Sequence, residues 1–256
     1  MDNFTTTIAR KVGARLAGNC PNFSESAFVE SAGSAGLGGW VSRISAALRS
    51  HLPRDFPSAV EILLRSVGSE LPPEDPMPEA HSFTPIVHFV VVYGREHFDL
   101  SMNTLHALSK RTYTAQAGVR RWLIENPDST MRVLGEWVHD SSPHVRRLVV
   151  NATRPRLRYP VMPGLSDLRR FRDDPEPVLR LLDHLRDDPS ETVRRAVAGS
   201  LSDIAKDNPD VAYERIKDWL GHGGKETRQI ARNALRYGSR KEDARALKLL
   251  DQAKSG

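Results

Sequence analysis

Cysteine is almost missing from this chain of 256 residues, in which Cys20 is the single example. One thiol excludes an intramolecular disulfide and a cysteine-rich zinc site, so Cys20 is most simply a small residue of the core or the surface. The nine histidines show no His-Glu-x-x-His pattern, and the Gly-x-Ser-x-Gly motif of serine hydrolases is absent. We therefore expect neither a metal ion nor a cofactor.

Long apolar runs are missing as well. The longest, residues 86–93, is interrupted by His88 and is far too short to span a bilayer. The first residues lack the apolar centre of a signal peptide and instead have the pattern of an amphipathic helix, with hydrophobic side chains at Phe4, Ile8, Val12 and Leu16. We expect a cytoplasmic protein that does not bind membranes.

A strong excess of charge is also absent, since 37 basic and 32 acidic residues give a net charge of only +5. With 39% hydrophobic and 27% charged residues, the composition is that of a folded globular protein, which excludes wholesale disorder. The charge is unevenly distributed, because residues 1–140 hold 13 basic and 15 acidic side chains, whereas residues 141–256 hold 24 and 17. The second half is therefore the part expected to bind a polyanion.

The chain is rich in signals for the start of a helix. A residue that can cap a helix precedes a proline at Asn126-Pro127, Ser142-Pro143, Asp174-Pro175, Asp188-Pro189 and Asn208-Pro209. Asn, Ser and Asp side chains accept hydrogen bonds from the first free amides of a helix, and proline at the first position lacks a donor that would be unpaired there. Each dipeptide therefore predicts a helix start. The residues that follow have helical spacing, which places Val193, Val197, Leu201 and Ile204 on one apolar face.

An internal repeat accompanies these signals. Residues 143–149, PHVRRLV, recur loosely 48 residues further on as VRRAV at 193–197, and more weakly 34 residues after that as TRQI at 227–230. Periods of roughly 35–47 residues are typical of HEAT repeats, whose helix pairs bury their apolar faces by stacking. We predict an all-α fold, a HEAT-like helical repeat solenoid forming a curved α-α superhelix. The prediction is a single domain over residues 1–256, with irregular N-terminal helices at 1–80 and more regular repeats at 81–252.

The first half of the chain is less regular. Residues 40–52 and 55–67 are predicted to form two helices, and residues 71–80, with four prolines and three acidic residues, an acidic surface linker. Residues 83–94 have the periodicity of a strand, but no convincing partner strand exists, so we predict a helix. The glycine-rich residues 31–39 lack the Gly-Lys-Ser/Thr of a phosphate-binding loop, which favours a flexible joint.

Arginine supplies the candidate binding residues. Pairs of arginines occur early in three predicted helices, and three more alternate along a long loop at residues 153–164. Exposed helix faces carry charge in any solenoid, but a repeat also places equivalent arginines on one surface, where they match a sugar–phosphate backbone. The candidate DNA-binding residues are Arg120, Arg121, Arg146, Arg147, Arg154, Arg156, Arg158, Arg194 and Arg195.

Residues 145–159, VRRLVVNATRPRLRY, resemble a segment that in one family usually reads VRRLVSEGXRPRLPW. That segment marks the AlkC branch of the AlkC/AlkD alkylpurine DNA glycosylases. Three other stretches are similar to the same family, namely HLPRDFP at 51–57, HFDLS at 97–101 and LSDIAKD at 201–207. The likeness extends from about residue 4 to 252, and its most specific part is the VRR…RPRL core.

The resemblance implies both a fold and a chemistry. Members of the family are HEAT-like repeat proteins that clamp duplex DNA on a concave surface and remove cationic bases such as 3-methyladenine or 7-methylguanine, with limited or no base flipping. Because the alkylated purine is already a good leaving group, the protein mainly has to stabilise positive charge on the sugar, through a carboxylate and an aromatic wall. Some members carry a C-terminal immunoglobulin-like domain, for which we expect no room in this chain.

The chain departs from the family where catalysis is implied. Two family glutamates align with Gln116 and Asn151, and the family tryptophan aligns with Tyr159. An amide offers no negative charge to the sugar, and the loss of one such electrostatic partner typically costs about 10²–10³ in rate. The resemblance leaves Asp203 and Tyr159 as catalytic candidates, although Asp203 is equally compatible with a structural acid that pairs with helix termini or with Lys206.

The binding residues are kept while the acids are replaced. We therefore predict a DNA-binding HEAT-like repeat protein related to DNA alkylation repair, which grips duplex DNA on a basic concave face and has weak or absent glycosylase activity. The alternatives are an active 3-methyladenine or 7-methylguanine DNA glycosylase and a protein-interaction scaffold. The expected partner is double-stranded DNA, with damaged and branched forms both open, bound by a monomer that associates with the nucleoid.

Overall fold

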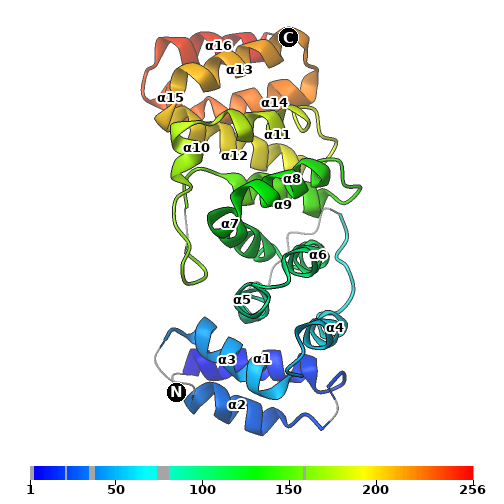
Figure 1. The fold of residues 1–256 in the computed structure, drawn as a ribbon. Coiled ribbons are helices and arrows are strands. Elements are labelled where there is room, and N and C mark those ends of the chain that lie inside the picture. Colours follow the sequence, from blue (N-terminus) through cyan, green and yellow to red (C-terminus); the bar gives the residue numbers. More distant parts are fainter. Residues whose placement is uncertain (1–2, 21, 35–37, 74–80, 158–159, 256) are drawn as a thin grey trace. The chain divides into compact units, whose positions relative to one another are not determined.

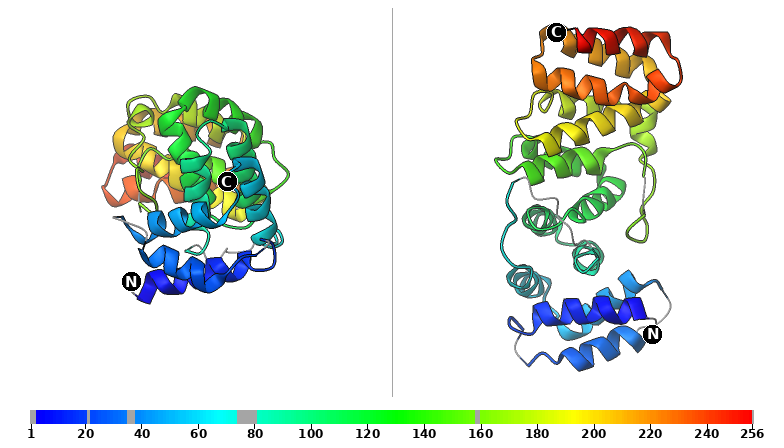
Figure 2. Two further views of the ribbon diagram at one scale, coloured as in Figure 1. Left: turned by 60° about the horizontal axis from the view of Figure 1, so that its bottom comes forward. Right: turned by 180° about the vertical axis from the view of Figure 1, so that it is seen from behind.

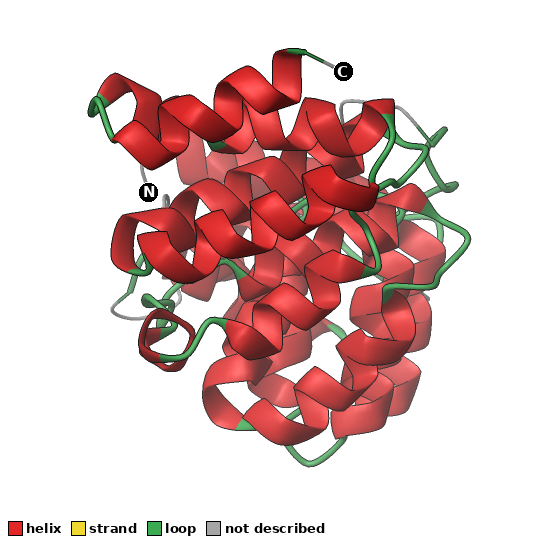
Figure 3. Ribbon diagram, turned by 90° about the horizontal axis from the view of Figure 1, so that it is seen from above, coloured by secondary structure: helices red, strands yellow, loops and turns green. Residues whose placement is uncertain are grey.

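The computed structural model describes residues 3–20, 22–34, 38–73, 81–157 and 160–255. Every regular element in these residues is a helix (Figures 1 and 3). This confirms the prediction of an all-α protein, including the helical interpretation of residues 83–94, where α5 spans Thr84–Tyr93. Within the same residues, no helix is both long enough and apolar enough to cross a lipid bilayer.

Contacts between residues divide the chain into two compact units. The first unit comprises Met1–Glu125 and Pro160–Leu165, and the second comprises Asn126–Tyr159 and Ser166–Gly256. The chain therefore passes from the second unit into the first and back again within the long loop. The prediction of one domain over residues 1–256 stays a prediction.

The first unit is built of helices, including those predicted at residues 40–52, 55–67 and 83–94. In its described residues the helices are α1 (Asn3–Leu16), α2 (Glu25–Ser34), α3 (Trp40–His51), α4 (Phe56–Ser66), α5 (Thr84–Tyr93), α6 (Phe98–Ser109) and α7 (Ala115–Glu125). Helix α2 packs against both α1 and α3, as the views of Figure 2 show, and α5 packs against both α3 and α7. Most of the predicted linker at 71–80 lies outside the described residues, as do residues 35–37 of the predicted glycine-rich joint. The first four residues of that joint, 31–34, form the end of α2 instead.

Helix α1 is the amphipathic helix that was predicted from the four-residue spacing of hydrophobic side chains. Ile8, Val12 and Leu16 are buried in the core, whereas Phe4 is 47% exposed and packs edge-on against Trp40 at 5.3 Å between ring centroids. Phe4 lies in the first turn of the helix, where it also contacts the ring of His81. The spacing thus identified the buried face correctly for all but its first residue.

The second unit repeats one arrangement along the chain. In its described residues the helices are α8 (Pro127–Trp137), α9 (Pro143–Thr153), α10 (Arg169–Asp173), α11 (Glu176–Asp183), α12 (Glu191–Asp207), α13 (Pro209–His222), α14 (Lys225–Ala234), α15 (Arg236–Arg240) and α16 (Ala244–Lys254). Helix α12 packs between α9 and α14, and α14 packs in turn against α16 (Figure 1). The predicted apolar face of α12 is buried, at Val193, Val197, Leu201 and Ile204. The stacking of α9, α12, α14 and α16 is the repeat that the sequence predicted.

The proline signals locate the helices with small errors. Pro127, Pro143 and Pro209 are the first residues of α8, α9 and α13, as predicted. The capping role predicted for the residues before them is wrong, because those Asn and Ser side chains make no capping hydrogen bond. At the two Asp-Pro dipeptides the helices begin one and two residues later than predicted, at Glu176 and Glu191.

The aspartates before the helices shape turns instead of capping them. Asp140 and Asp188 each accept a hydrogen bond from the amide of the residue two positions further on, at 2.7 and 2.9 Å. In each repeat an arginine six residues after the aspartate, Arg146 or Arg194, donates through Nη1 to the carbonyl oxygens of that aspartate and of the next residue, at 2.7–3.1 Å. The internal repeat is thus reproduced in individual hydrogen bonds, which explains the delayed start of α12.

Candidate nucleic-acid interface

Two arginines fasten the start of the long loop to helix α12. Arg154 bonds to Asp203 and Arg156 bonds to Asp207, in each case through Nε and Nη2. The spacings match, because two residues of extended chain advance about 6.6 Å and four residues of helix advance about 6.0 Å. The R-x-R sequence of the loop and the D-x-x-x-D sequence of the helix are therefore complementary.

Asp203 lies inside this contact, with 1% of its surface exposed. Its Oδ2 accepts hydrogen bonds from Arg154, with Nε at 2.8 Å, and its Oδ1 accepts one from Lys206 Nζ at 2.7 Å. Charge-assisted bonds of this kind are the strong ones in proteins. The carboxylate is thus neutralised by two cations of the protein itself, and the pairing with Lys206 that the sequence left open is present.

A glycine allows the Arg154 guanidinium to lie against the backbone of α12. Nη2 of Arg154 donates to the carbonyl oxygen of Gly199 at 3.1 Å. A β-carbon at position 199 would come within 3.1 Å of Nη1 of the same arginine. The absence of a side chain at Gly199 therefore leaves room for the guanidinium beside Asp203.

Asp207 is the centre of a second ion cluster. It accepts hydrogen bonds from Arg156 (2.6 and 3.0 Å) and from Arg172 (3.0 Å). Burial raises the pKa of the Asp207 carboxyl, but the hydrogen bonds from the two guanidinium groups outweigh it and hold the pKa below its usual value. Arg172 also pairs with Asp167, which accepts a hydrogen bond from the amide of Leu157 at 2.8 Å. The loop is thus fixed through both side chains and backbone.

The first arginine of each predicted pair is used within the fold. Arg146 bonds Asp188 in a bidentate fashion, at 2.6 and 2.9 Å, and that carboxylate is almost fully buried. The equivalent Arg194 donates from Nε to Gln229 on α14 at 2.8 Å. Arg120, on α7 of the first unit, is buried as well. Arg146 and Arg194 therefore brace neighbouring elements, and Arg120 is too buried to be an open contact for DNA, which the sequence pattern alone did not reveal.

The second arginine of each pair is more exposed. Arg121, in the first unit, bonds Glu125 on its own helix and donates to the carbonyl oxygen of Gly164 at 2.9 Å. Arg147 is half-buried on α9. Arg195 is the most accessible, with 69% of its side chain exposed, and it pairs with Glu191 one turn earlier on α12. Among the predicted pairs, the second position is therefore the better candidate for an external partner.

The remaining predicted residues divide between the two units. Gln116 is a half-buried residue of the first turn of α7, in the first unit, and Asn151 is a half-buried residue near the end of α9, in the second. Arg158 and Tyr159 lie outside the described residues. Over the described ranges, no group of three or more His, Cys, Asp or Glu side chains is arranged to hold a metal ion.

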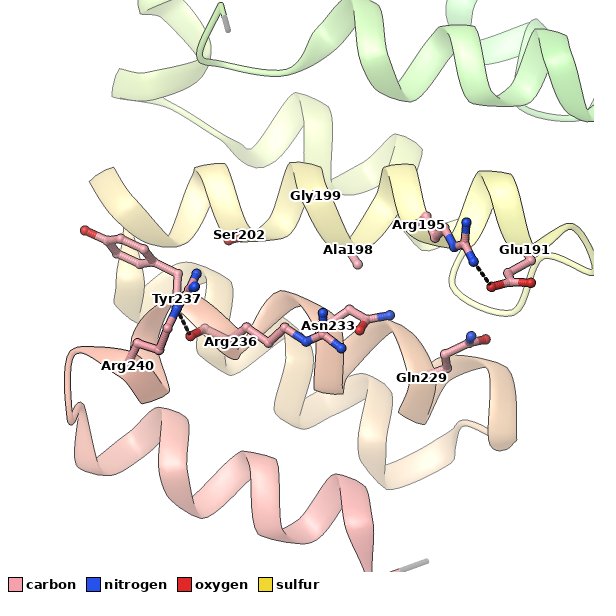
Figure 4. Close-up of a pocket in the computed structure, with 10 residues that line it drawn as sticks. All are labelled: Glu191, Arg195, Ala198, Gly199, Ser202, Gln229, Asn233, Arg236, Tyr237 and Arg240. Carbon is pink, nitrogen blue, oxygen red and sulfur yellow. Dashed lines mark hydrogen bonds and ion pairs between the residues drawn. The ribbon is translucent and has the colours of Figure 1, made fainter. Parts of the chain in front are cut away.

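A polar groove that was not predicted runs along α12, past Arg195, Ala198 and Ser202 (Figure 4). It lies between α12 on one wall and α14 and α15 on the other, with a volume of about 590 Å³. Of the predicted DNA-binding residues it contains Arg195. It adds the polar or basic residues Gln229, Asn233, Arg236, Tyr237 and Arg240. The available signal was the weak repeat at 227–230, which locates α14 beside α12, followed by the RYGSR sequence at 236–240.

The fold and these contacts define an all-α helical-repeat protein whose second unit is braced by arginines and carries a basic groove. A sequence model described as "DNA alkylation repair enzyme" matches residues 113–241, which is half of the chain. The chain belongs to the DNA alkylation repair enzyme family. The matched range contains the arginine–aspartate pairs of α9 and α12 and the whole of the groove.

Two known proteins are similar over most of the chain. The uncharacterised protein YhaZ of Bacillus subtilis (strain 168) is 29% identical over 209 residues, which cover 81% of this chain and 54% of YhaZ. The chain therefore spans about half the length of this curated relative. A solved structure of the Pseudomonas fluorescens alkylpurine DNA glycosylase AlkC, bound to DNA containing an abasic site analog, matches 96% of this chain and 66% of AlkC, with 28% identity and a TM-score of 0.83. The helical repeat fold and the family resemblance are thereby confirmed.

Proposed function

We propose that this protein binds double-stranded DNA through the basic side of its second unit and that its glycosylase activity is weak or absent. Its family supports a role in DNA alkylation repair, and the solved relative is a glycosylase bound to DNA. The uneven charge supports the location, because residues 141–256 hold 24 basic against 17 acidic side chains.

The weakness of the chemistry is inferred chiefly from Asp203. Departure of an alkylated purine leaves positive charge on the sugar, and a preorganised carboxylate stabilises that charge. Asp203 is 1% exposed, and its charge is balanced by Arg154 and Lys206. The other two positions of the expected acids hold the neutral amides of Gln116 and Asn151. None of these three residues therefore offers an uncompensated negative charge.

An active alkylpurine glycosylase is the second candidate, and the Arg154–Asp203 pair is the observation in its favour. A DNA phosphate is a strong bidentate partner for a guanidinium group. If a phosphate drew Arg154 away, one oxygen of Asp203 would become available beside the loop. In that case the acid would become active only on bound DNA.

The release of free base from duplex DNA carrying 7-methylguanine or 3-methyladenine distinguishes the two candidates. For the wild-type protein we expect release at the rate of a protein-free control. Release well above that rate, and its loss in a folded Asp203→Asn variant, would contradict the proposal and favour the active enzyme.

A gain-of-function variant tests the same reasoning from the other side. Replacing Gln116→Glu together with Asn151→Glu restores both acids of the family pattern. We expect measurable base release from this variant and none from the matched Gln116→Ala, Asn151→Ala control. Equal release from both variants would mean that missing charge is not what limits the chemistry.

DNA binding is tested by its dependence on salt. A protein that contacts 6–10 phosphates typically loses about 10³–10⁵ in affinity between 50 and 200 mM salt. We expect this protein to bind the duplex as a monomer and to lose affinity steeply over the same range of salt. A comparison of intact, lesion-containing and branched duplexes then identifies the preferred form of DNA. A protein-interaction scaffold would show no duplex binding even at the lower salt concentration.

A further inference from the structure

The groove between α12 and the α14–α15 segment has two chemically different ends. Glu191 and Arg195 lie at the end nearer the start of α12, beside Gln229 (Figure 4). Tyr237 and Arg240 lie at the opposite end, near Ser202 on α12. The groove is therefore elongated and polar, and it follows α12 for most of the length of the helix.

The charge inside the groove is strongly positive. Three guanidinium groups, those of Arg195, Arg236 and Arg240, share it with one carboxylate, that of Glu191. Glu191 is bonded to Arg195 at 2.5 Å. Among the described residues, no carboxylate pairs with Arg236 or Arg240, and like charges four residues apart destabilise a helix. Arg240 Nε donates to the backbone carbonyl oxygen of Arg236 at 3.2 Å, which does not neutralise either charge. Both guanidinium charges are therefore available to an external anion.

Neutral groups complete a site for a phosphate and its neighbours. The Arg236 side chain extends along the groove toward Asn233, whose amide can donate to an oxygen (Figure 4). Gln229 accepts a bond from Arg194 through Oε1, which leaves its NH₂ group as a donor. Guanidinium groups bind phosphate oxygens in a bidentate fashion, and amides add orienting contacts.

The groove is also linked to the ion cluster of Asp203. Lys206, which bonds Asp203, lies with its Nζ 5.4 Å from the centroid of the Tyr237 ring. Tyr237 lines the groove from α15, while Lys206 belongs to α12. The aromatic end of the groove is thus held against the same part of α12 that anchors the loop arginine Arg154.

We propose that this groove is a phosphodiester-binding site for a strand of DNA, with Arg236 and Arg240 as its anion ligands, and that Glu191 lowers its affinity by holding Arg195. The proposal rests on the proposed function and names one site and one residue that regulates it. When a phosphate enters, Arg195 exchanges Glu191 for a phosphate oxygen, so the ion pair on α12 competes directly with the DNA.

Equilibrium binding of a fluorescently labelled undamaged duplex by the full chain tests the anion ligands. We expect the Arg236→Gln, Arg240→Gln variant to lose about tenfold or more in affinity at 50 mM salt. We also expect its affinity to depend less steeply on salt, with a slope of log affinity against log salt that corresponds to about 1–2 fewer phosphate contacts. The matched control is Arg65→Gln with Arg180→Gln, which removes two exposed arginines of α4 and α11. Thermal unfolding of all variants verifies that each is folded.

The role of Glu191 has an opposite and specific signature. We expect Glu191→Gln to tighten duplex binding about threefold, and we expect no gain when Arg195→Gln is also present, because Glu191 acts through that arginine. The control Glu61→Gln removes the acid of an exposed pair of the same spacing on α4, with Arg65, and should leave the affinity unchanged. An equal gain from both variants would mean that only the overall charge matters and would overturn the proposal.

The outcomes separate the groove from the function of the protein. If the wild-type protein binds duplex DNA with a steep salt dependence while the groove variants behave like their controls, the groove proposal is wrong and the proposed function stands. If the wild-type protein does not bind duplex DNA, both are wrong.

Competition by inorganic phosphate identifies the source of the anion. Weak displacement of the duplex supports a DNA strand as the ligand. Complete displacement at low millimolar phosphate would assign the site to a small phosphate and overturn the strand proposal.

Discussion

Two arginine-rich regions flank helix α12, and they differ in how their charges are balanced. In the loop at residues 154–157, each guanidinium group bonds a carboxylate of α12. In the groove, Arg236 and Arg240 face no carboxylate partner within the described part of the chain. The partner of an arginine, and not its occurrence in a repeat, therefore separates a residue that holds the fold from one that is available to an anion.

The ion pairs of the two regions also differ in burial, and burial determines how much each pair affects stability. Asp203 and Asp188 are almost fully buried and each holds an arginine, so removing one member leaves an uncompensated charge away from water. Arg195 and its partner are exposed, where ion pairs contribute little because water screens them. The loop region should therefore govern stability, and the groove should govern binding.

The largest effect is expected at the most buried acid. Asp203→Asn leaves Arg154 and Lys206 without their shared counter-charge, and we expect a loss of about 3–5 kcal/mol in the free energy of unfolding. Urea denaturation measures it. The control Asp128→Asn removes an acid that is 93% exposed in its pair with Arg170, and it should cause no measurable change. Similar losses in both variants would contradict the distinction between buried and exposed pairs.

The equivalent braces of two repeats should differ in strength. Arg146→Ala leaves the buried Asp188 carboxylate without its bidentate partner, so we expect a loss of about 3 kcal/mol. Arg194→Ala removes a bond to the neutral Gln229, and about 1–2 kcal/mol is expected. Chemical denaturation of the two variants measures both losses. A larger loss in the Arg194 variant than in the Arg146 variant would contradict the expected order.

The cluster around Asp207 predicts a pH dependence. Burial raises the pKa of this carboxyl, but the hydrogen bonds from Arg156 and Arg172 hold it below the usual value. A lowered folded-state pKa stabilises the protein above a pH of about 4, and that contribution disappears as the pH falls through the folded-state value. We expect Asp207→Asn to cost about 1–2 kcal/mol at pH 7 and progressively less toward pH 3. A constant difference between variant and wild type over this range would contradict the ionic origin.

The smallest effect on stability is expected in the groove. Arg236→Gln should change the free energy of unfolding by no more than about 0.5 kcal/mol, since the side chain is exposed and has no carboxylate partner in the described residues. The same substitution should weaken DNA binding. A variant that is destabilised as strongly as the Arg146 variant would show that the groove arginines are also structural, and the comparison between the two regions would then fail.

Much of the architecture could be predicted from the sequence because helices leave local signals. The apolar spacing identified the buried faces of α1 and α12, and three prolines marked the first residues of their helices. The weak repeat at 227–230 correctly indicated a helix equivalent to α9 and α12. These features depend on neighbours within one or two turns, which a single sequence records directly.

The roles of the arginines could not be predicted in the same way. Arg146 meets Asp188, and Arg154 meets Asp203, across 42 and 49 residues of sequence. Such pairs depend on which helices become neighbours, so no local pattern separates them from exposed arginines. One clue was present, because the two-residue spacing of the loop arginines matches the four-residue spacing of Asp203 and Asp207 when an extended segment lies along a helix.

We propose that DNA binding persists in this protein while base excision is weak or absent. The deciding measurement is the release of 7-methylguanine from a labelled duplex, at a protein concentration at which the duplex is shown to be fully bound. We predict complete binding together with a release rate equal to that of the protein-free duplex. Release well above that rate, and abolished by Asp203→Asn in a folded variant, would contradict the proposal.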